Sequence, residues 1–353
     1  MAAEGWNAMK VRVRLVFFLF ALLFAISQAR VTQAGARQAS PEPHWDAALV
    51  KPCDRACLVA IMDGYMNAIF QHDPKAVRPL ALDIRMTENT GQMDVGEGLL
   101  WRSKVEPTSF KIYVADPVAG QVAEQARVKI QGQDALVAVR LRIDRGKILE
   151  IEQLWARPVD KTAIPLLTMP RETMVNDVPV SQRSSRELLL RAANSYFDAL
   201  EGDDGKIGAF ADDCVRHENG YQTVNNPPPG GRMMPAPMLP DPNTEQGKAQ
   251  LKFSMLTCAQ QIDSKTFAYM KHIRPRRALI IDEQKGLVAT FPLFVHDGTR
   301  RGAPPDAPPG MLQNLVTMET FGIRGGLIHE VEAFPFVTIP YGLGNGWTPG
   351  SGR

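Results

Sequence analysis

The chain has 353 residues, of which 44% are hydrophobic and 22% are charged, a composition typical of globular proteins. This length and composition exclude disorder of the whole chain and allow two domains of ordinary size. The formal net charge is +2, with 40 basic and 38 acidic residues spread along the chain. Because this spread provides no basic surface for a phosphate backbone, we do not expect nucleic acid as a partner.

The N-terminal segment predicts a secretory signal. Basic residues at positions 10–14 precede a short uncharged, apolar run at positions 15–26. Such a run is short for crossing a bilayer, and small residues follow it, as a signal peptidase requires. We therefore assign residues 1–34 to a signal peptide cleaved near Ala29 or Ala34. The mature protein is then expected to be secreted or periplasmic, without membrane contact, and an uncleaved membrane anchor is the alternative.

Four cysteines remain in the mature chain, an even number in a protein expected in an oxidising compartment. Cys53 and Cys57 could bridge across the start of a helix, and Cys214 with Cys258 would close a long loop. Four cysteines allow three connectivities, so the pairing stays open. The C-x3-C spacing lacks a second such pair or histidines at ligand spacing, and we expect no metal site and no cofactor.

An internal repeat organises the chain. Two segments carry the same apolar stripe with steps of three and four residues, which predicts two amphipathic helices. The stripes are offset by 131 positions and consist of Leu58, Ile61, Met62, Tyr65, Met66 and Ile69, and of Leu189, Ala192, Ala193, Tyr196, Phe197 and Leu200. Asp54 is the predicted N-cap of the first helix, and Ser184 with Glu187 forms a possible capping box for the second.

The match continues beyond the helices. Thr87-Glu88-Asn89 aligns with His217-Glu218-Asn219, and the segment from Gly146 aligns with the segment from Gly326. In the first copy, alternating residues predict an antiparallel meander. Its four strands are expected near residues 110–115, 122–130, 135–143 and 148–155. Helices followed by strands indicate the α+β class.

These patterns divide the chain into two similar domains. We expect a first domain at residues 50–157, a linker at 158–184, a second domain at 185–336 and a tail at 337–353. The second copy alone contains proline-rich insertions, from Asn225 and from Gly302, which cannot lie inside a sheet. They form either a lid over a pocket or solvated loops.

Several of these segments together resemble a known family. They are CDRACL at the start of a helix, TEN after the second helix, VGEGLLW, and the terminal GKILEIEQLW. The resemblance is to a domain of unknown function in secreted fungal and bacterial proteins, within the ketosteroid-isomerase-like superfamily. That superfamily also contains nuclear transport factor 2 and the SnoaL-like polyketide cyclases. The resemblance implies two tandem cystatin-like cones, each with helices on a curved antiparallel sheet and an interior suited to a small apolar ligand. It implies no activity. The catalytic aspartate of the cyclases has no counterpart here.

The second copy contains the densest group of polar side chains. A base, an acid and hydrogen-bonding groups occur within six positions, namely His217, Glu218, Asn219, Tyr221 and Gln222. Histidine is a general base near neutral pH, and the tyrosine and amides suit an oxyanion. The alternative is that Glu-Asn at a strand edge only satisfies backbone groups. The first copy offers Glu88 and Asn89 for ligand binding, and Tyr65 and Tyr196 lie on the core-facing stripes.

The register of the terminal hairpin decides where the paired glutamates point. A two-residue turn directs Glu150 and Glu152 into the cone, whereas a bulged turn pairs them with Arg142 and Arg140. We favour the arginine-paired register. In the second copy, the inward register would place Glu332 beside a second carboxylate in the pocket, so we count it with His217 and Glu218 as catalytic candidates.

We therefore expect an exported protein, a monomer or homodimer, that binds a small apolar molecule. Isomerisation, dehydration or hydrolysis by acid/base catalysis, without a cofactor, is a possible consequence. The alternative is a non-catalytic extracytoplasmic binding or interaction protein.

Overall fold

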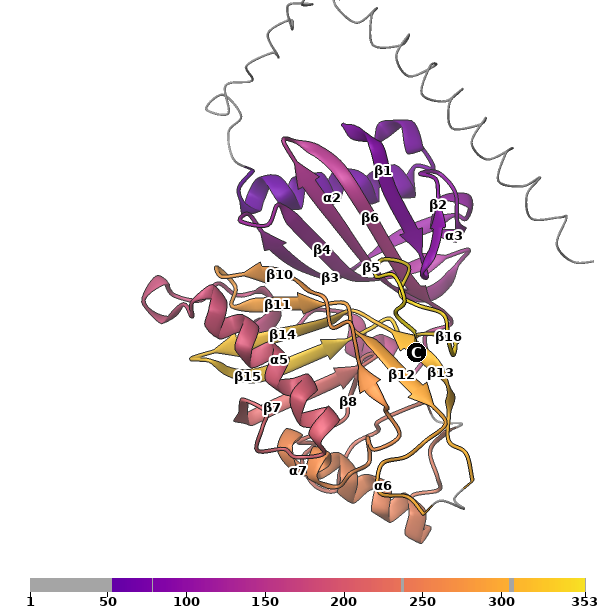
Figure 1. Ribbon diagram of the computed structural model, residues 1–353, viewed down its shortest axis with the longest axis vertical. Helices are drawn as coiled ribbons and strands as arrows, with labels where there is room; N and C mark the ends of the chain where they lie inside the picture. Colours follow the sequence, from indigo (N-terminus) through magenta and orange to yellow (C-terminus); the bar gives the residue numbers. More distant parts are fainter. Residues whose placement is uncertain (1–52, 78, 236–237, 305–307, 353) are drawn as a thin grey trace, which may run out of the picture. The chain divides into compact units, whose positions relative to one another are not determined.

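A computed structural model describes residues 53–352, apart from 78, 236–237 and 305–307 (Figure 1). The expected signal peptide lies outside the described residues. The described chain is α+β, with two curved six-stranded sheets and one four-stranded sheet, which confirms the predicted fold class and fits two domains. Among the described residues, no helix combines the length and apolar character needed to cross a membrane.

The first sheet holds the predicted meander. Its strands, in spatial order, are β2 (Gly91–Met93), β1 (Leu80–Glu88), β6 (Lys147–Ala156), β5 (Gln133–Asp144), β4 (Gln121–Ile130) and β3 (Val105–Asp116). Strands β3 to β6 pair antiparallel through short turns, as predicted. However, β1 pairs with β6 in parallel, so the sheet is mainly antiparallel with one parallel pair. The long connection from β1 to β6 permits this direction, which a hairpin would not.

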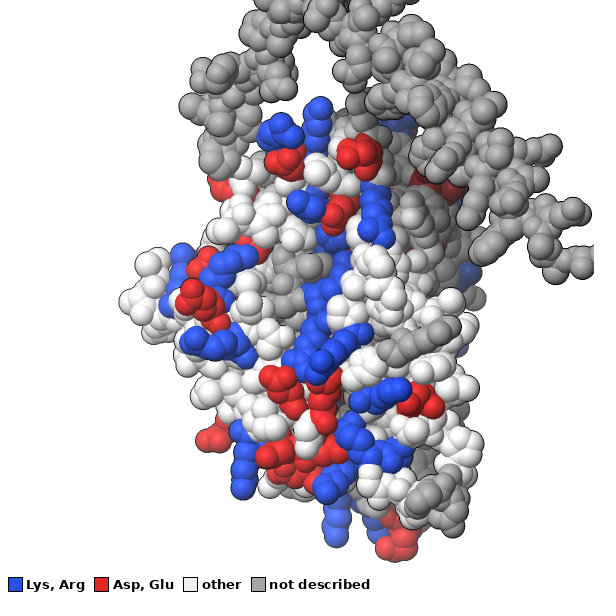
Figure 2. Space-filling model, viewed as in Figure 1, with Lys and Arg blue, Asp and Glu red and all other residues white. Residues whose placement is uncertain are grey.

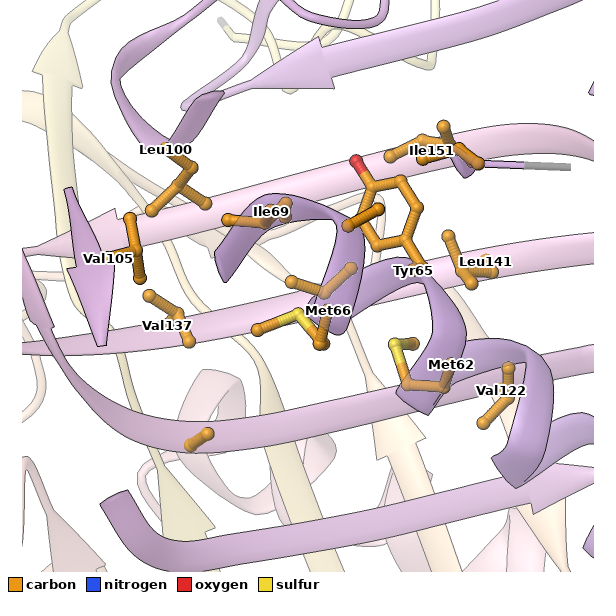
Figure 3. Close-up of a cluster of buried hydrophobic side chains, with 14 of the residues drawn as sticks. Met62, Tyr65, Met66, Ile69, Leu100, Val105, Val122, Val137, Leu141 and Ile151 are labelled. Carbon is orange, nitrogen blue, oxygen red and sulfur yellow. The ribbon is translucent and has the colours of Figure 1, made fainter. Parts of the chain in front are cut away.

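Helix α2 (Arg55–Phe70) fills the inner face of the first sheet. Asp54 Oδ1 accepts a hydrogen bond from Cys57 N at 2.9 Å, which confirms the predicted N-cap. The predicted stripe faces the sheet, and Figure 3 shows side chains of α2 against those of the strands. Tyr65 packs edge-on against Trp101 of the short helix α3 (Leu99–Arg102). Side chains therefore fill the first cone. The 3-10 helix η3 (Pro74–Ala76) follows α2.

The second sheet repeats this topology. Its strands, in spatial order, are β8 (Tyr221–Gln222), β7 (Phe210–Glu218), β15 (Leu327–Ala333), β14 (Glu319–Arg324), β11 (Leu287–Thr290) and β10 (Ala278–Asp282). Strand β7 pairs with β15 in parallel, as β1 does with β6. Helix α5 (Arg186–Gly202) packs on the inner face, and its N-cap is Ser185, whose side chain accepts from Leu188 N. The prediction of Ser184 was thus wrong by one residue.

The second copy also carries elements that the sequence did not predict. A third sheet consists of β16 (Val337–Pro340), β13 (Leu312–Val316), β12 (Leu293–Asp297) and β9 (His272–Ile273). Helices α6 (Glu245–Met255) and α7 (Cys258–Asp263) follow the first proline-rich insertion. Residues from 337 onward, expected as a tail, supply β16, and Trp347 Nε1 donates to Thr87 Oγ1 of the first sheet at 2.9 Å.

Both disulfides suggested by the sequence form. Cys53 bonds to Cys57 at the start of α2, and Cys214 of β7 bonds to Cys258 of α7. Among the described residues, no cysteine is free. The second bond fixes α7 against the edge of the second sheet.

The outer faces of the two six-stranded sheets share one apolar core. Phe110 and Leu136 of the first sheet belong to the same buried cluster as Leu287 of the second. The connector, the linker expected at residues 158–184, supplies Leu167 and Met174 to this cluster, so it is partly buried. It forms η4 (Ile164–Leu167), α4 (Glu172–Val175) and η5 (Val180–Gln182).

Two reciprocal ion pairs join the copies. Arg55, the first residue of α2, donates to Asp282 of the second sheet at 2.8 Å. Arg186, the first residue of α5, donates to Asp116 of the first sheet at 2.9 Å. Each buried aspartate also accepts a backbone N–H from the other copy, from Ala115 or from residue 281. Equivalent residues of the repeat thus exchange partners across the interface.

Candidate functional site

His217 and Glu218 lie on opposite faces of the second sheet. They are consecutive residues of β7, and side chains alternate along a strand. His217 faces the outer side, where its Nδ1 is 3.6 Å from Glu330 Oε1. Glu218 accepts a hydrogen bond from Arg216 Nε at 2.8 Å instead. The two residues grouped as base and acid in the sequence therefore do not meet over one reacting atom.

Glu332 lies on the His217 side, together with Glu330. One ligand-type atom from each of these three buried residues lies within 4.8 Å of the others. Arg171, from the connector, bonds to a Glu332 oxygen and lies 3.3 Å from Glu330 Oε1. Burial and the nearby Arg171 lower the pKa of His217 to about 2, and burial raises the pKa of Glu332 to about 7 and also that of Glu330.

The first sheet carries arginines at the equivalent positions. Arg140 pairs with Glu152 and Arg142 with Glu150 across β5 and β6, and a bulge follows Arg142. This confirms the arginine-paired register. Arg277 also contacts both oxygens of Glu152, at 2.7 and 2.8 Å. The guanidinium groups hold the pKa of Glu150 and of Glu152 below its ordinary value despite burial.

The other candidates of the first copy have structural partners. Glu88 accepts backbone N–H groups of Leu99 and Leu100 at the start of α3, at 2.6 and 3.2 Å. Asn89 donates to the carbonyl oxygen of Trp155 and accepts from its N–H. Tyr65 OH accepts from Gln153 Nε2 at 2.8 Å inside the first core. These bonds match the alternative in which the Glu-Asn pair satisfies backbone groups.

Two candidates of the second copy are also engaged internally. Tyr196 is buried among Phe197, Phe210 and Phe321. Gln222 donates to the carbonyl oxygens of residues 224 and 225, at 2.9 and 3.1 Å. The second cone, like the first, is filled by side chains.

The remaining candidates converge on a cavity outside both cones. It has a volume of about 370 Å³, and Glu218, Asn219 and Tyr221 contribute to its wall. The first sheet and the connector supply Leu136, Ala156, Pro158, Val159 and Asp160, and the second copy adds Met233, Met234, Pro235, Met238 and Phe336. We call this space the methionine cavity. The first proline-rich insertion, suggested by the sequence as a lid, thus forms part of its wall.

Some polar groups in the wall of the methionine cavity have hydrogen-bond partners, and one has none. Tyr221 OH donates to Asp160 Oδ1 at 2.6 Å and lies 2.6 Å from Thr162 Oγ1. In contrast, Asn219 Oδ1 is buried and has no hydrogen-bond partner among the described residues. The equivalent oxygen in the first copy, on Asn89, is satisfied by Trp155 N. An unpaired buried acceptor is costly, so Asn219 is the wall residue best suited to a ligand donor.

Sequence reasoning missed Asp160, Arg171 and the methionines. The sequence did contain one signal: the insertion places Met233, Met234 and Met238 among prolines, and flexible methionines are frequent at adaptable binding surfaces. Arg171 carried no signal, because its role depends on the path of the connector.

A buried charge cluster lies inside the second core. Arg216 donates to Gln261 Oε1 at 2.7 Å and to Thr223 Oγ1 at 3.1 Å. Burial, and then the nearby Glu218, raise the pKa of Glu319 to about 8. Glu319 pairs with Ala333 in the sheet, so it does not lie beside Glu332.

On the face shown in Figure 2, basic and acidic side chains lie beside one another.

Comparisons with known proteins support the resemblance for the second half of the chain. Residues 182–335 match the family model described as a domain of unknown function (DUF8021). No curated protein matches the chain.

Similar solved structures include NTF2-like proteins. One, of unknown function from Cytophaga hutchinsonii, is 11% identical, covers 28% of this chain and 89% of its own, and has a TM-score of 0.24. An NTF2-like protein from Burkholderia thailandensis is 21% identical, with 28% and 88% covered and a TM-score of 0.22. A putative hydroxylase from Streptomyces galilaeus is 16% identical, with 30% and 93% covered and a TM-score of 0.24.

Proposed function

We propose that the chain is an exported protein, built from two tandem copies of one domain, that binds a small and largely apolar molecule in the methionine cavity. The predicted signal peptide and the two disulfides support export, because disulfides persist in oxidising compartments. The identical strand order of the two six-stranded sheets supports the tandem arrangement.

One observation carries the binding proposal: Asn219, whose side-chain oxygen is buried without a partner among the described residues, contributes to the wall of an otherwise mainly apolar cavity. Ligand sites typically have volumes of about 300–1,000 Å³, apolar walls and few polar groups, and this cavity fits that description. The ligand should carry an apolar body and at least one O–H or N–H group. The carboxylate of Glu218 offers a second acceptor at the same wall.

The positions of the polar residues support binding rather than catalysis. A general base must reach the same reacting atom as its acid, and His217 and Glu218 lie on opposite faces of β7. The hydroxyl of Tyr221 is already held by Asp160 and Thr162. These arrangements favour the non-catalytic form of the expected binding protein.

A titration with an apolar fluorophore tests the proposal. N-phenyl-1-naphthylamine has an aromatic body and one N–H donor, and its fluorescence rises in apolar surroundings. We expect saturable binding that is lost when Ala156→Trp fills the cavity. The control is Ala60→Trp, at an exposed position of α2. Equal binding by both variants and the wild type would place the probe elsewhere and refute the proposal.

A further inference from the structure

The group formed by His217, Glu330 and Glu332 has unpartnered donor atoms that face one another. His217 is 5% exposed, Glu330 3% and Glu332 0%. His217 Nδ1, Glu330 Oε1 and Glu332 Oε1 are all buried without a hydrogen bond among the described residues. Arg171 Nε forms an ion pair with Glu330 Oε1 at 3.3 Å, but His217 Nδ1 and Glu332 Oε1 make no hydrogen bond within the described part of the chain. Buried polar atoms normally have partners, so these two indicate a missing ligand.

The spacing of these atoms suits a metal ion. Two donor atoms at about 2.1 Å from one ion stand roughly 3.4 Å apart at the tetrahedral angle. His217 Nδ1 and Glu330 Oε1 are 3.6 Å apart, and all three residues meet within 4.8 Å. One imidazole and two carboxylates form a donor set used by divalent first-row transition metals.

In the first sheet, arginines offset the charge of the two equivalent glutamates. There, the two glutamates contact three guanidinium groups, from Arg140, Arg142 and Arg277. Three positive and two negative charges give a local balance of +1. The first sheet also places Thr87 where the second has His217, so it lacks the imidazole ligand.

The second sheet lacks the two cross-strand arginines. Thr320 stands opposite Glu332 and Gly322 opposite Glu330, where the first sheet has Arg140 and Arg142. Arg171 is the arginine paired with both carboxylates, and Arg324 acts on Glu330 from the wall of the neighbouring cleft. A divalent cation would offset the charge of the two carboxylates, which in the first sheet is offset by paired guanidinium groups. A side chain at Gly322 would collide with Thr173, 2.6 Å from the position of its Cβ, so an arginine does not fit there.

A cleft leads from solvent to this group. Its volume is about 440 Å³, and its wall contains four carboxylates, of Glu172, Asp177, Asp213 and Glu330, together with Arg324 and His329. Asp177 pairs with Lys285 and Asp213 with His329. We call it the acidic cleft. Carboxylates lining a concave surface raise the local concentration of cations, so the cleft provides an entry path.

We propose that His217, Glu330 and Glu332 bind a divalent transition-metal ion such as Zn²⁺ or Mn²⁺, admitted through the acidic cleft. Arg171 holds the second oxygen of Glu332 and so orients the carboxylate, as residues around metal ligands commonly do. Three protein donors leave coordination positions for water, the arrangement of an open site. The site lies on the face of β7 opposite to Glu218, so the proposal is independent of the methionine cavity.

Metal titration of the chelator-treated, secreted protein tests this proposal. We expect Zn²⁺ to bind by calorimetry and Mn²⁺ by electron paramagnetic resonance. His217→Gln and Glu332→Gln should each weaken binding at least about tenfold, a loss seen even when only a residue orienting a ligand is changed. The matched control is Glu150→Gln, the counterpart of Glu330 in the first sheet, which should leave the affinity unchanged.

Anomalous diffraction from zinc-soaked wild-type crystals gives a second measurement that needs no variant to fold. A peak between His217, Glu330 and Glu332 supports the proposal. No binding at millimolar Zn²⁺ and Mn²⁺, or a peak only elsewhere, such as at His329 and Asp213, overturns it. Equal affinity of the wild type and both ligand variants would overturn it as well.

Discussion

His217 stands directly opposite Glu332 in the parallel pair of β7 and β15, at the position where Thr87 faces Glu152 in the first sheet. The two sheets thus present the same backbone positions with different chemistry. In the first sheet, arginines and Trp347 enclose the glutamates, since the indole lies 4.8 Å from the Arg140 guanidinium. In the second, the glutamates border the acidic cleft through Glu330.

Glu319→Gln should stabilise the protein at high pH. The pKa of Glu319 is raised from 4.5 to about 8 by burial, so the folded protein retains a proton that the unfolded chain loses. The stability from this proton is full below pH 4.5 and is lost as the pH rises to about 8. Glutamine imitates the protonated form at every pH. In urea unfolding, the variant should therefore match the wild type near pH 4.5 and exceed it by a few kcal/mol at pH 9. A constant difference would contradict this.

Arg186→Ala should destabilise the protein much more than a surface change. It leaves the fully buried Asp116 without its ion partner, and breaking a buried pair costs about 3–5 kcal/mol. The backbone N–H groups that Asp116 also accepts place the expected value near the lower end. The control is Arg102→Ala, whose pair with Glu97 is exposed and contributes about 0–1 kcal/mol. Chemical denaturation measures both, and equal losses would refute the interface role.

Removal of the disulfide that closes the longer loop should lower the free energy of unfolding more than removal of the other. Cys214 and Cys258 are 44 residues apart, and Cys53 and Cys57 are 4 apart. Loop-closure entropy predicts losses of about 4 and about 2 kcal/mol for the two double Cys→Ser variants. Denaturant unfolding of each variant checks the order. A larger loss from the short loop would show that local contacts, rather than chain entropy, dominate.

Asn219→Gly should remove a preference for ligands with a donor group. Asn219 has a φ of 48°, which glycine adopts without strain, so the turn should persist. The wild type should bind 1-naphthol more tightly than naphthalene, by about 0.5–1.5 kcal/mol for one hydrogen bond. In the variant the two affinities should converge. Calorimetry or competition with the fluorophore measures them, and an unchanged difference would exclude Asn219 as the acceptor.

Much of the fold could be predicted from the sequence, because local patterns set it. The helical stripes and the four meander strands follow from periodicity. The arginine-paired register does not follow from turn length, because the turn has two residues and a bulge after Arg142 shifts the pairing. The third sheet could not be predicted, because its short strands pair across distant segments, such as β16 with β13. The parallel pairing of β1 with β6 likewise depends on a long connection.

The candidate site was predicted less well. Grouping His217 with Glu218 by closeness in sequence overlooked strand alternation, which places them on opposite faces. The methionine cavity joins Leu136, Asp160 and Met234, which no local pattern connects. The expectation of no metal site considered cysteine spacing and histidine spacing, whereas the proposed ligands come from two strands that meet only in the folded sheet.

A co-crystal structure with N-phenyl-1-naphthylamine would show whether the methionine cavity binds an apolar ligand. We expect density for the probe in the methionine cavity, between Met234 and Tyr221, with its N–H within hydrogen-bonding distance of Asn219 Oδ1. Density for the probe only at other places, or a cavity closed by the side chains of the proline-rich insertion, would contradict the proposed function.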